Sequence, residues 1–499
     1  MNRPLSSSQA VLGGSTAAAR DSLGSPTDGI AHRASAGLHP TVVLTVLCVA
    51  QFIGALDVFI VNVALPKIGA AFGEHSLSNL SWVLNAYAIV IAALMIPAGR
   101  LADVFGRKRV FLLGLAVFTV ASIRAASSGT LWVLVGFRIL QAAGAAALTP
   151  TSLGLLMVAA PEDKRDLHVK IWTASAALAA ATGPVVGGLL VEASWRWIFL
   201  INLPIGVIAI ATAIRFVPDV AREAGARLPD LLGGLLLVIA IGSLALGLVR
   251  GPQWGWAGTA TVASFAVAAT ALLTFLWRSA HHRNPMLDLN LLRSRVLSSA
   301  SLSALLYFAS FGILLLSSVL WMQGHWHYSA IKTGLAIAPG PCSVLLFAGL
   351  SEVAAKKVPV GVIAAFGCVL SAVGAVLLLS SIGNSSHYVA DFLPGWLLVC
   401  IGFALAMPTV TSSGTAELPP EQSATGSAVV NVSVQVGLVI GISILVAVLG
   451  TASTAAGLHV FKAAWWAAAG IVLGGSVAAF RVTPRQMLSI TDAPSVGEA

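Results

Sequence analysis

Residues 99–109 read GRLADVFGRKR and place five charges and two glycines between two apolar segments, Leu80–Ala98 and Val110–Ile123. Lys and Arg collect on short loops that face the cytoplasm, so this stretch is expected to be a cytoplasmic hinge between two membrane spans. Topology alone would account for the basic residues, but it leaves unexplained the fixed arrangement of Gly99, Asp103, Gly106 and Arg107. The stretch therefore favours a membrane transporter.

The composition of the whole chain also indicates a membrane protein. Of its 499 residues, 57% are hydrophobic and only 9% are charged, whereas a soluble domain has about 25% charged residues. The net charge of +9 does not indicate nucleic-acid binding, because the basic residues lie in short loops and form no single basic face. Anionic membrane lipid is the expected partner of these loops.

The sequence has no motif for nucleotide-driven transport or for catalysis. It has no P-loop or other nucleotide-binding motif, so we expect no nucleotide partner. No cluster of His, Asp or Cys recurs near the end of an apolar segment, so we expect no enzyme, no cofactor and no metal site. His325 and His327 flank Trp326, and we interpret them as part of an interfacial aromatic cluster rather than as metal ligands.

About twenty apolar residues are needed to cross the hydrocarbon core of a bilayer. By this criterion the sequence contains about fourteen spans. The expected fold is all-α and integral to the membrane, with an even number of spans that leaves both termini on one side. The expected spans are Thr41–Ala64, Leu80–Ala98, Val110–Ala126, Leu131–Ala159, Val169–Val191, Trp197–Val217, Leu231–Val249, Gly258–Trp277, Val296–Trp321, Ile331–Leu350, Val360–Ser380, Phe392–Ser412, Ala424–Gly450 and Val460–Phe480.

The loop charges predict an orientation and a division into halves. With both termini in the cytoplasm, inner segments hold 21 Lys and Arg and outer segments hold 6, with Arg138 inside a span. Two long inner loops bracket two spans with few polar residues, which we interpret as an insert between two six-helix halves. The expected parts are a disordered cytoplasmic tail at 1–40, a six-helix bundle at 41–217, the two-helix insert with its flanking loops at 218–295, a second six-helix bundle at 296–480 and a cytoplasmic tail at 481–499.

Two charged side chains lie inside expected spans and away from their ends, where an unpaired charge costs several kcal/mol. Asp57 lies in the middle of the first span, where it can bind and release a proton or, alternatively, hold neighbouring helices by hydrogen bonds. Arg138 lies in the fourth span, with Gln141 one turn further along the same face. It can hold an anionic group, or it can snorkel to the outer interface, which is about two turns away at Leu131.

These segments together resemble the major facilitator superfamily, specifically its fourteen-helix drug:proton antiporter branch of the QacA and EmrB type. The resemblance covers roughly residues 41–480. GRLADVFGRKR is similar to the family's loop between the second and third helices, and FRILQAAGAAALTP to its fourth-helix motif. LDVFIVNVALP and SWRWIFLINLPIG are similar to signatures of this branch. GPVVGGLL is similar to the fifth-helix antiporter motif, with matches at Gly183, Pro184, Gly187 and Gly188.

The resemblance implies roles for these residues. Asp57 and Arg138 would couple transport to protons, Asp103 with its flanking motif would latch the two halves, and the fifth-helix glycines would control the exchange mode. The expected function is export of a small amphipathic drug or toxic metabolite across the cytoplasmic membrane, driven by the proton gradient through alternating access. Besides the coupling pair, the residues expected to line the substrate cavity between the halves are Asn62, Tyr87, Gln141, Asn431 and Gln435.

Two alternative functions remain open at this point. One is a dedicated secondary transporter of a single nutrient, lipid or siderophore. The other is a membrane sensor or scaffold that transports nothing, in which the two extra spans serve interaction.

Overall fold

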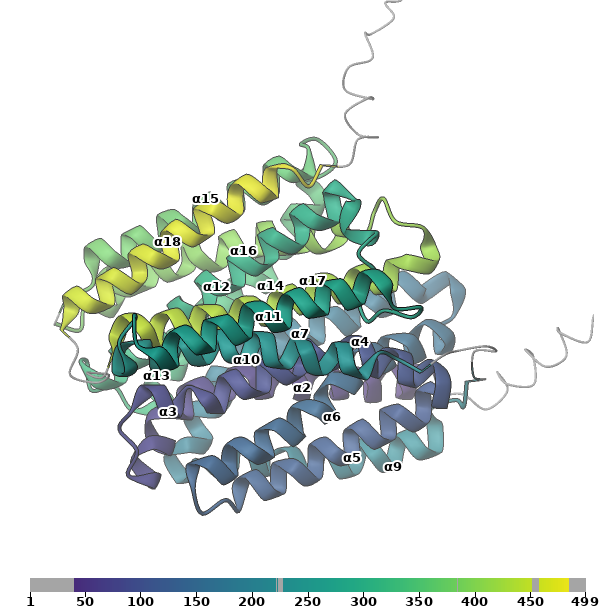
Figure 1. Ribbon diagram of the computed structural model, residues 1–499, viewed down its shortest axis with the longest axis horizontal. Coiled ribbons are helices and arrows are strands. Elements are labelled where there is room, and N and C mark those ends of the chain that lie inside the picture. Colours follow the sequence, from purple (N-terminus) through teal and green to yellow (C-terminus); the bar gives the residue numbers. More distant parts are fainter. Residues whose placement is uncertain (1–39, 221, 223–227, 384, 451–456, 484–499) are drawn as a thin grey trace, which may run out of the picture.

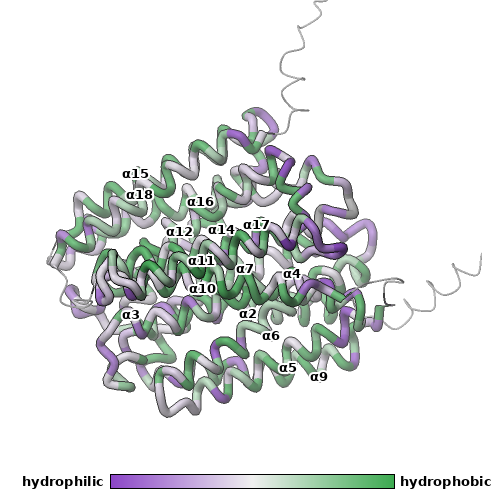
Figure 2. Tube along the Cα trace, viewed as in Figure 1, coloured by the Kyte–Doolittle hydropathy of each residue, from purple (hydrophilic) through white to green (hydrophobic). Residues whose placement is uncertain are grey.

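The computed structural model describes residues 40–220, 222, 228–383, 385–450 and 457–483 of the chain. Within these residues it contains helices and no strand, and fourteen helical segments are long and apolar enough to cross a membrane. The expectation of an all-α membrane fold with about fourteen spans is confirmed. Figure 1 shows the helices running roughly side by side along the long axis, and Figure 2 shows hydrophilic residues gathered in the loops at their ends.

The first bundle consists of the six spans before residue 217. Its elements are α2 (Pro40–Phe72), α3 (Leu77–Leu80), α4 (Trp82–Phe105), α5 (Arg107–Ala126), α6 (Leu131–Ala159), the short turn η1 (Glu162–Lys164), α7 (Arg165–Ala193), α8 (Trp197–Leu200) and α9 (Asn202–Phe216). The helices α3 and α4 together form one span, as do η1 with α7 and α8 with α9.

The insert consists of α10 (Leu231–Trp254) and α11 (Thr259–His281). The second bundle follows, with η2 (Leu291–Arg293), α12 (Arg295–Gly324), α13 (Ala330–Ile337), α14 (Pro339–Ala354), α15 (Val360–Ser381), η3 (Tyr388–Phe392), α16 (Leu393–Gly414), α17 (Pro420–Leu449) and α18 (Leu458–Phe480). The tails expected at 1–40 and 481–499 lie almost entirely outside the described residues.

The first span is longer than expected, because α2 continues past Ala64 to Phe72. Pro66 lies inside this helix. A proline removes one backbone hydrogen bond, but it does not end a helix whose flanks are packed. Leu65 and Ile68 are both 0% exposed, so tertiary burial holds the helix together across the proline.

The two bundles meet along two seams. On one side α7 packs against α13 and α14, and on the other side α4 packs against α17. In the insert, α10 packs against both α4 and α17 and carries α11 on its outer side, so the insert covers the second seam. Figure 1 shows α10 and α11 in front of this seam, between α5, α6 and α9 below and α15, α16 and α18 above.

The insert is hydrogen-bonded to the first bundle. Ser78 Oγ donates to the carbonyl oxygen of Val249 at 3.0 Å, and Arg250 Nη2 donates to Asn79 Oδ1 at 2.5 Å. Its contacts with α17 are apolar: Leu237 and other residues of α10 belong to a cluster that includes the valines of α17. Polar bonds therefore hold the insert on one bundle, and apolar packing joins it to the other.

The helical bundle has two different ends. α2 begins and α18 ends toward the right of Figure 1, and we call this the basic end because most loop Lys and Arg residues lie there. At the opposite end the bundles are in close contact: α12 is buried on every side from Ala309 to Met322, and Gln323 Nε2 donates to Val63 O of α2 at 3.0 Å. Toward the basic end, Leu302 of α12 is 50% exposed and Asn431 of α17 is exposed.

Candidate functional site

Asp57 of α2 and Arg138 of α6 form an ion pair inside the first bundle, and each residue is 1% exposed. Arg138 Nη1 donates to Asp57 Oδ2. Gln141, one turn along α6, donates from Nε2 to Asp57 Oδ1 at 2.9 Å and accepts from Arg138 Nη1 at 2.8 Å. Two side chains of one helix therefore hold both oxygens of the carboxylate. The interpretation of Arg138 as a snorkelling residue is wrong, because its side chain is buried against Asp57.

The network extends beyond the residues that the sequence singled out. Gln141 Nε2 also lies 2.8 Å from Ser122 Oγ of α5, and Asn202 Nδ2 of α9 donates to the same hydroxyl at 3.3 Å. Both Ser122 and Asn202 are buried. Ser122 was missed because a lone serine in an apolar helix gives no signal, whereas Asn202 stands in the branch signature SWRWIFLINLPIG.

Arg138 also connects the network to α4. Its Nε donates to the carbonyl oxygen of Val83 at 3.2 Å, and its guanidinium lies over the Tyr87 ring, 3.9 Å from the centroid. The Phe199 ring lies on another side at 5.8 Å. A cation over an aromatic face is stabilised electrostatically, so these rings stabilise the buried guanidinium in its place.

A small cavity of about 40 Å³ lies between the two bundles beside this network. Three of the expected cavity residues, Asn62, Tyr87 and Gln435, line it, together with Arg138. Gln141 does not line it, because the side chain lies within the network behind Arg138. Asn431 lies one turn along α17 toward the basic end, where its Nδ2 donates to Ser427 O at 2.9 Å. The remaining aromatic members of the lining are Phe59, Phe308 and Phe311.

The stretch at 99–109, expected to be a hinge, is helical except for Gly106 between α4 and α5, and it is held within the first bundle. Asp103 and Arg107 form an ion pair at 3.2 Å with side chains about one-third exposed, and Arg107 Nη1 donates to Gly154 O of α6 at 3.2 Å. Gly106 has φ 101°, a conformation that favours glycine, at the junction of the two helices. Gly99 lies against Pro150 of α6, where an added Cβ would be 3.4 Å from the proline Cβ.

The glycines of α7 face two different neighbours. A Cβ on Gly183 would lie 2.9 Å from Phe59 Cβ, and one on Gly187 would lie 2.7 Å from Ile60 Cγ1, so both glycines pack against α2. Gly188 instead faces the second bundle, where a Cβ would lie 2.5 Å from the carbonyl oxygen of Ala330.

Pro184, buried within α7, also takes part in this contact between the bundles. Its carbonyl oxygen lies so close to Gly334 of α13 that a Cβ on that glycine would be 2.0 Å away. The motif therefore brings three helices together: α2, α7 and α13.

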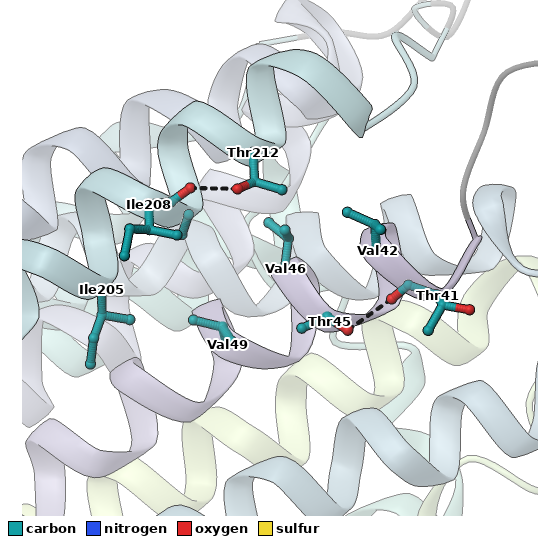
Figure 3. A pocket seen from close by; sticks show the side chains of 9 residues that line it. Thr41, Val42, Thr45, Val46, Val49, Ile205, Ile208 and Thr212 are labelled. Atoms are coloured by element: carbon teal, nitrogen blue, oxygen red, sulfur yellow. Dashed lines mark hydrogen bonds between the residues drawn. The ribbon is translucent and has the colours of Figure 1, made fainter.

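A larger hollow of about 360 Å³ lies away from this network, between α2 and α9 (Figure 3). Its threonines bond within their own helices: Thr45 Oγ1 donates to Thr41 O at 2.8 Å, and Thr212 Oγ1 donates to Ile208 O at 2.7 Å. Ile208 is 66% exposed, so the hollow lies on the outside of the first bundle. With an almost wholly apolar lining and no charged side chain, it is a lipid-facing surface feature rather than a transport site.

Comparison with known proteins places the chain in a family. Residues 47–442 match the model of the Major Facilitator Superfamily. Multidrug resistance protein Stp of Mycobacterium tuberculosis is 34% identical over 83% of this chain and 76% of its own length. Tetracenomycin C resistance and export protein of Streptomyces glaucescens is 30% identical over 94% of this chain and 85% of its own length. Multidrug export protein EmrB of Escherichia coli is 31% identical over 81% of this chain and 79% of its own length.

Solved structures agree on the fold. A D-xylose-proton symporter superimposes with a TM-score of 0.63 at 13% identity, covering 89% of this chain and 98% of its own. The POT family transporter PepTSo superimposes with a TM-score of 0.65 at 15% identity, covering 90% of this chain and 99% of its own. The chain belongs to the major facilitator superfamily, in its fourteen-helix branch of the QacA and EmrB type.

Proposed function

We propose that the protein is a proton-coupled exporter of small amphipathic molecules, including drugs or toxic metabolites, that works by alternating access between its two bundles. The observation that carries this proposal is the buried pair of Asp57 and Arg138 beside the cavity where the bundles meet. Ionisable residues placed within a membrane at a substrate pathway are the usual elements of proton relays. Relatives named for multidrug resistance and antibiotic export support export over uptake of a nutrient.

The orientation proposed for the protein places the basic end, with both termini, in the cytoplasm of the cell. The loops at that end hold 21 Lys and Arg when the terminal tails are included, against 6 at the opposite end. Reporter fusions at the C-terminus and in the loop at 282–294 test this directly. Both should report a cytoplasmic location, and an external signal from either would overturn the orientation.

Protonation of Asp57 is the proposed coupling step. The carboxylate compensates the guanidinium of Arg138, whereas a protonated Asp57 leaves Arg138 as an unpaired buried cation, which costs several kcal/mol. Arg138 is also bonded to Val83 of α4, and α4 packs against α17 of the other bundle. A change of charge at Asp57 therefore reaches the seam between the bundles, and proton uptake favours a different arrangement of them.

The lining of the central cavity suits an amphipathic substrate. Phe308 and Phe311 offer aromatic surface, Asn62 and Gln435 offer amide groups, and Arg138 is the one charged side chain among the lining residues. None of the described acids lines it, so a permanent cation finds no direct partner there, and we propose neutral molecules as the preferred substrates.

The central cavity must widen before it can accept such a molecule. Its volume of about 40 Å³ is far below the roughly 300–1,000 Å³ of ordinary ligand sites. The opposite end is closed by the buried outer halves of α2 and α12. The bundles are therefore expected to separate at the basic end, which gives access from the cytoplasm in the proposed orientation.

Everted membrane vesicles test the proposed function. A screen for efflux in a sensitised host first identifies a transported compound, and the vesicles should then accumulate it when their interior is acid and lose it when a protonophore is added. Proton-driven uptake that appears only in right-side-out vesicles would instead support an importer of one nutrient, lipid or siderophore. Absence of proton-dependent movement for every efflux hit would contradict the proposal.

A further inference from the structure

A cavity of about 260 Å³ lies between the insert and both bundles, apart from the central cavity. Its walls come from α4, α10, α11, α12, α17 and the loop that leads into α12. The lining is apolar apart from Ser301 and Ser433. Leu302, which is 50% exposed, lies at its border, so the cavity has an opening beside α12, close to the start of that helix at Arg295.

One lining side chain has an unfilled hydrogen-bonding capacity. Ser301 is 8% exposed, and its hydroxyl has no hydrogen-bond partner among the described residues. Ser433, by contrast, donates to the carbonyl oxygen of Val429 at 3.1 Å. A buried polar group without a partner is unfavourable, so a ligand that brings a polar atom to this wall would satisfy the Ser301 hydroxyl.

The loop that closes the cavity is basic on its outer side. Met286, Leu287 and Leu292 of this loop line the cavity. Arg293 directly follows Leu292 and is exposed, as is Arg295 at the start of α12, and neither forms an ion pair within the described residues. Arg283 is exposed on the same loop, which also holds Asp288, so the segment that lines this end of the cavity carries more basic than acidic residues.

The vertical spacing matches a phospholipid rather than a soluble anion. Ser301 is six residues from Arg295 along α12, a rise of about 9 Å. A phospholipid has an anionic phosphate at the surface, ester groups just below it and apolar chains below those. Along α12, Arg295, Ser301 and then the apolar Leu302 and Leu305 follow in the same order from the basic end inward.

We propose that this cavity binds an anionic phospholipid, with one acyl chain against the apolar lining, an ester oxygen at the Ser301 hydroxyl and the phosphate at Arg293 and Arg295. The lipid would then contact α4, α10, α12 and α17 together. It would stabilise the arrangement in which the insert covers the seam between the bundles. The proposal does not depend on proton coupling or on the identity of the transported compound.

Native mass spectrometry of the purified full-length protein tests this proposal with two lipids of identical chains, phosphatidylglycerol and phosphatidylcholine. The wild-type protein should retain phosphatidylglycerol preferentially. The double variant Arg293→Gln with Arg295→Gln should lower that retention about 30-fold, which corresponds to about 2 kcal/mol for two arginines at a membrane surface. Leu302→Trp, which narrows the opening, should also displace the lipid.

A matched control carries the same charge change elsewhere at the basic end. Lys357→Gln with Arg481→Gln alters two exposed basic residues outside the cavity, and its lipid retention should stay at the wild-type level. Equal retention of both lipids by the wild type would overturn the proposal. So would a loss of phosphatidylglycerol from the control variant as large as the loss from the Arg293 and Arg295 double variant. If Leu302→Trp abolished transport in every lipid while phosphatidylglycerol remained bound, the cavity would belong to the substrate pathway instead.

Discussion

Gln141 Nε2 donates to Asp57 Oδ1 at 2.9 Å, and both side chains are buried. Gln141 thereby orients the carboxylate without adding a second charge next to Arg138. An amide can do this because it donates to Asp57 while its carbonyl oxygen accepts from Arg138. Both oxygens of the Asp57 carboxylate are held by α6, so in the coupling step that we propose its protonation would act on α2 and α6.

Gln141→Leu should destabilise the protein by about 1–3 kcal/mol, because Asp57 Oδ1 and the Arg138 guanidinium each lose a buried partner. The midpoint of thermal unfolding in detergent measures this. Leu140→Ala is the matched control, since Leu140 is the neighbouring residue of the same helix and is 44% exposed. Equal midpoints for the two variants would mean that the amide bonds contribute nothing to the network.

Gly187→Leu should impair transport far more than Leu189→Ala. A Cβ added at Gly187 would lie 2.7 Å from Ile60 Cγ1 of α2. Leu189, by contrast, is 59% exposed. Overpacking of this kind costs about 1–3 kcal/mol and shifts the helices apart. Transport assays at matched membrane expression compare the two. Similar activity in both variants would mean that the close contact between Gly187 and α2 has no role in transport.

Asp103→Asn should leave the protein folded and inserted while slowing transport. Its ion pair with Arg107 is about one-third exposed, and exposed pairs contribute about 0–1 kcal/mol, so stability should change little. The carboxylate lies at the end of α4, and in the latch role that we propose for it a change of charge would act on the movement of one bundle against the other. Quantitative membrane blots and initial transport rates separate the two effects. Loss of the protein from the membrane, with normal transport per remaining molecule, would make Asp103 a folding residue.

The Asp230–Arg278 pair predicts a pH-dependent contribution of the insert to stability. Burial raises the pKa of Asp230, but hydrogen bonds from the Arg278 side chain and the Gly233 N–H, with the charges of Arg278 and His282, outweigh burial and leave that pKa below its usual value. A lowered pKa stabilises the fold above the unfolded value of about 3.9. The contribution is lost as the pH falls through the folded value.

Asp230→Asn should therefore lower the thermal midpoint at pH 7, by an amount equivalent to about 1–3 kcal/mol. The difference from wild type should shrink as the pH falls below the unfolded value of about 3.9, because the pH then approaches the lowered pKa of the folded carboxylate. The readout is thermal unfolding of both proteins across this pH range. A constant difference at all pH values would contradict an electrostatic origin.

The number and order of the spans were predictable because apolar length is a local property of the chain. Several span ends differ from the expected ones, and that of α2 is informative: Pro66 and Lys67 lower the local apolar character, while tertiary packing holds the helix together. Rules based on apolar length and charge treat each helix separately. They therefore predict that a helix is present more reliably than they predict the residues at which it begins and ends.

The candidate site was predictable only in part. Asp57 and Arg138 stood out because ionisable residues are rare in spans, but their pairing joins α2 to α6 and could not be derived from spacing. Asn62, Tyr87 and Gln435 line the cavity, whereas Asn431 lies on the same helix one turn away from it. Ser122 differs in nothing local from other serines of apolar helices, and only tertiary contact assigns it to the network.

Proton-driven export by Asp57→Asn in proteoliposomes, with pH and voltage clamped separately, tests the central claim most directly. For one proton per neutral molecule, 100 mV supplies about 2.3 kcal/mol and one pH unit about 1.4 kcal/mol, together about 3.7 kcal/mol. This drives at most about a 500-fold gradient of substrate. We predict that the wild type uses both driving forces and that Asp57→Asn uses neither, while binding of the substrate remains measurable. Undiminished proton-driven export by Asp57→Asn would contradict the account.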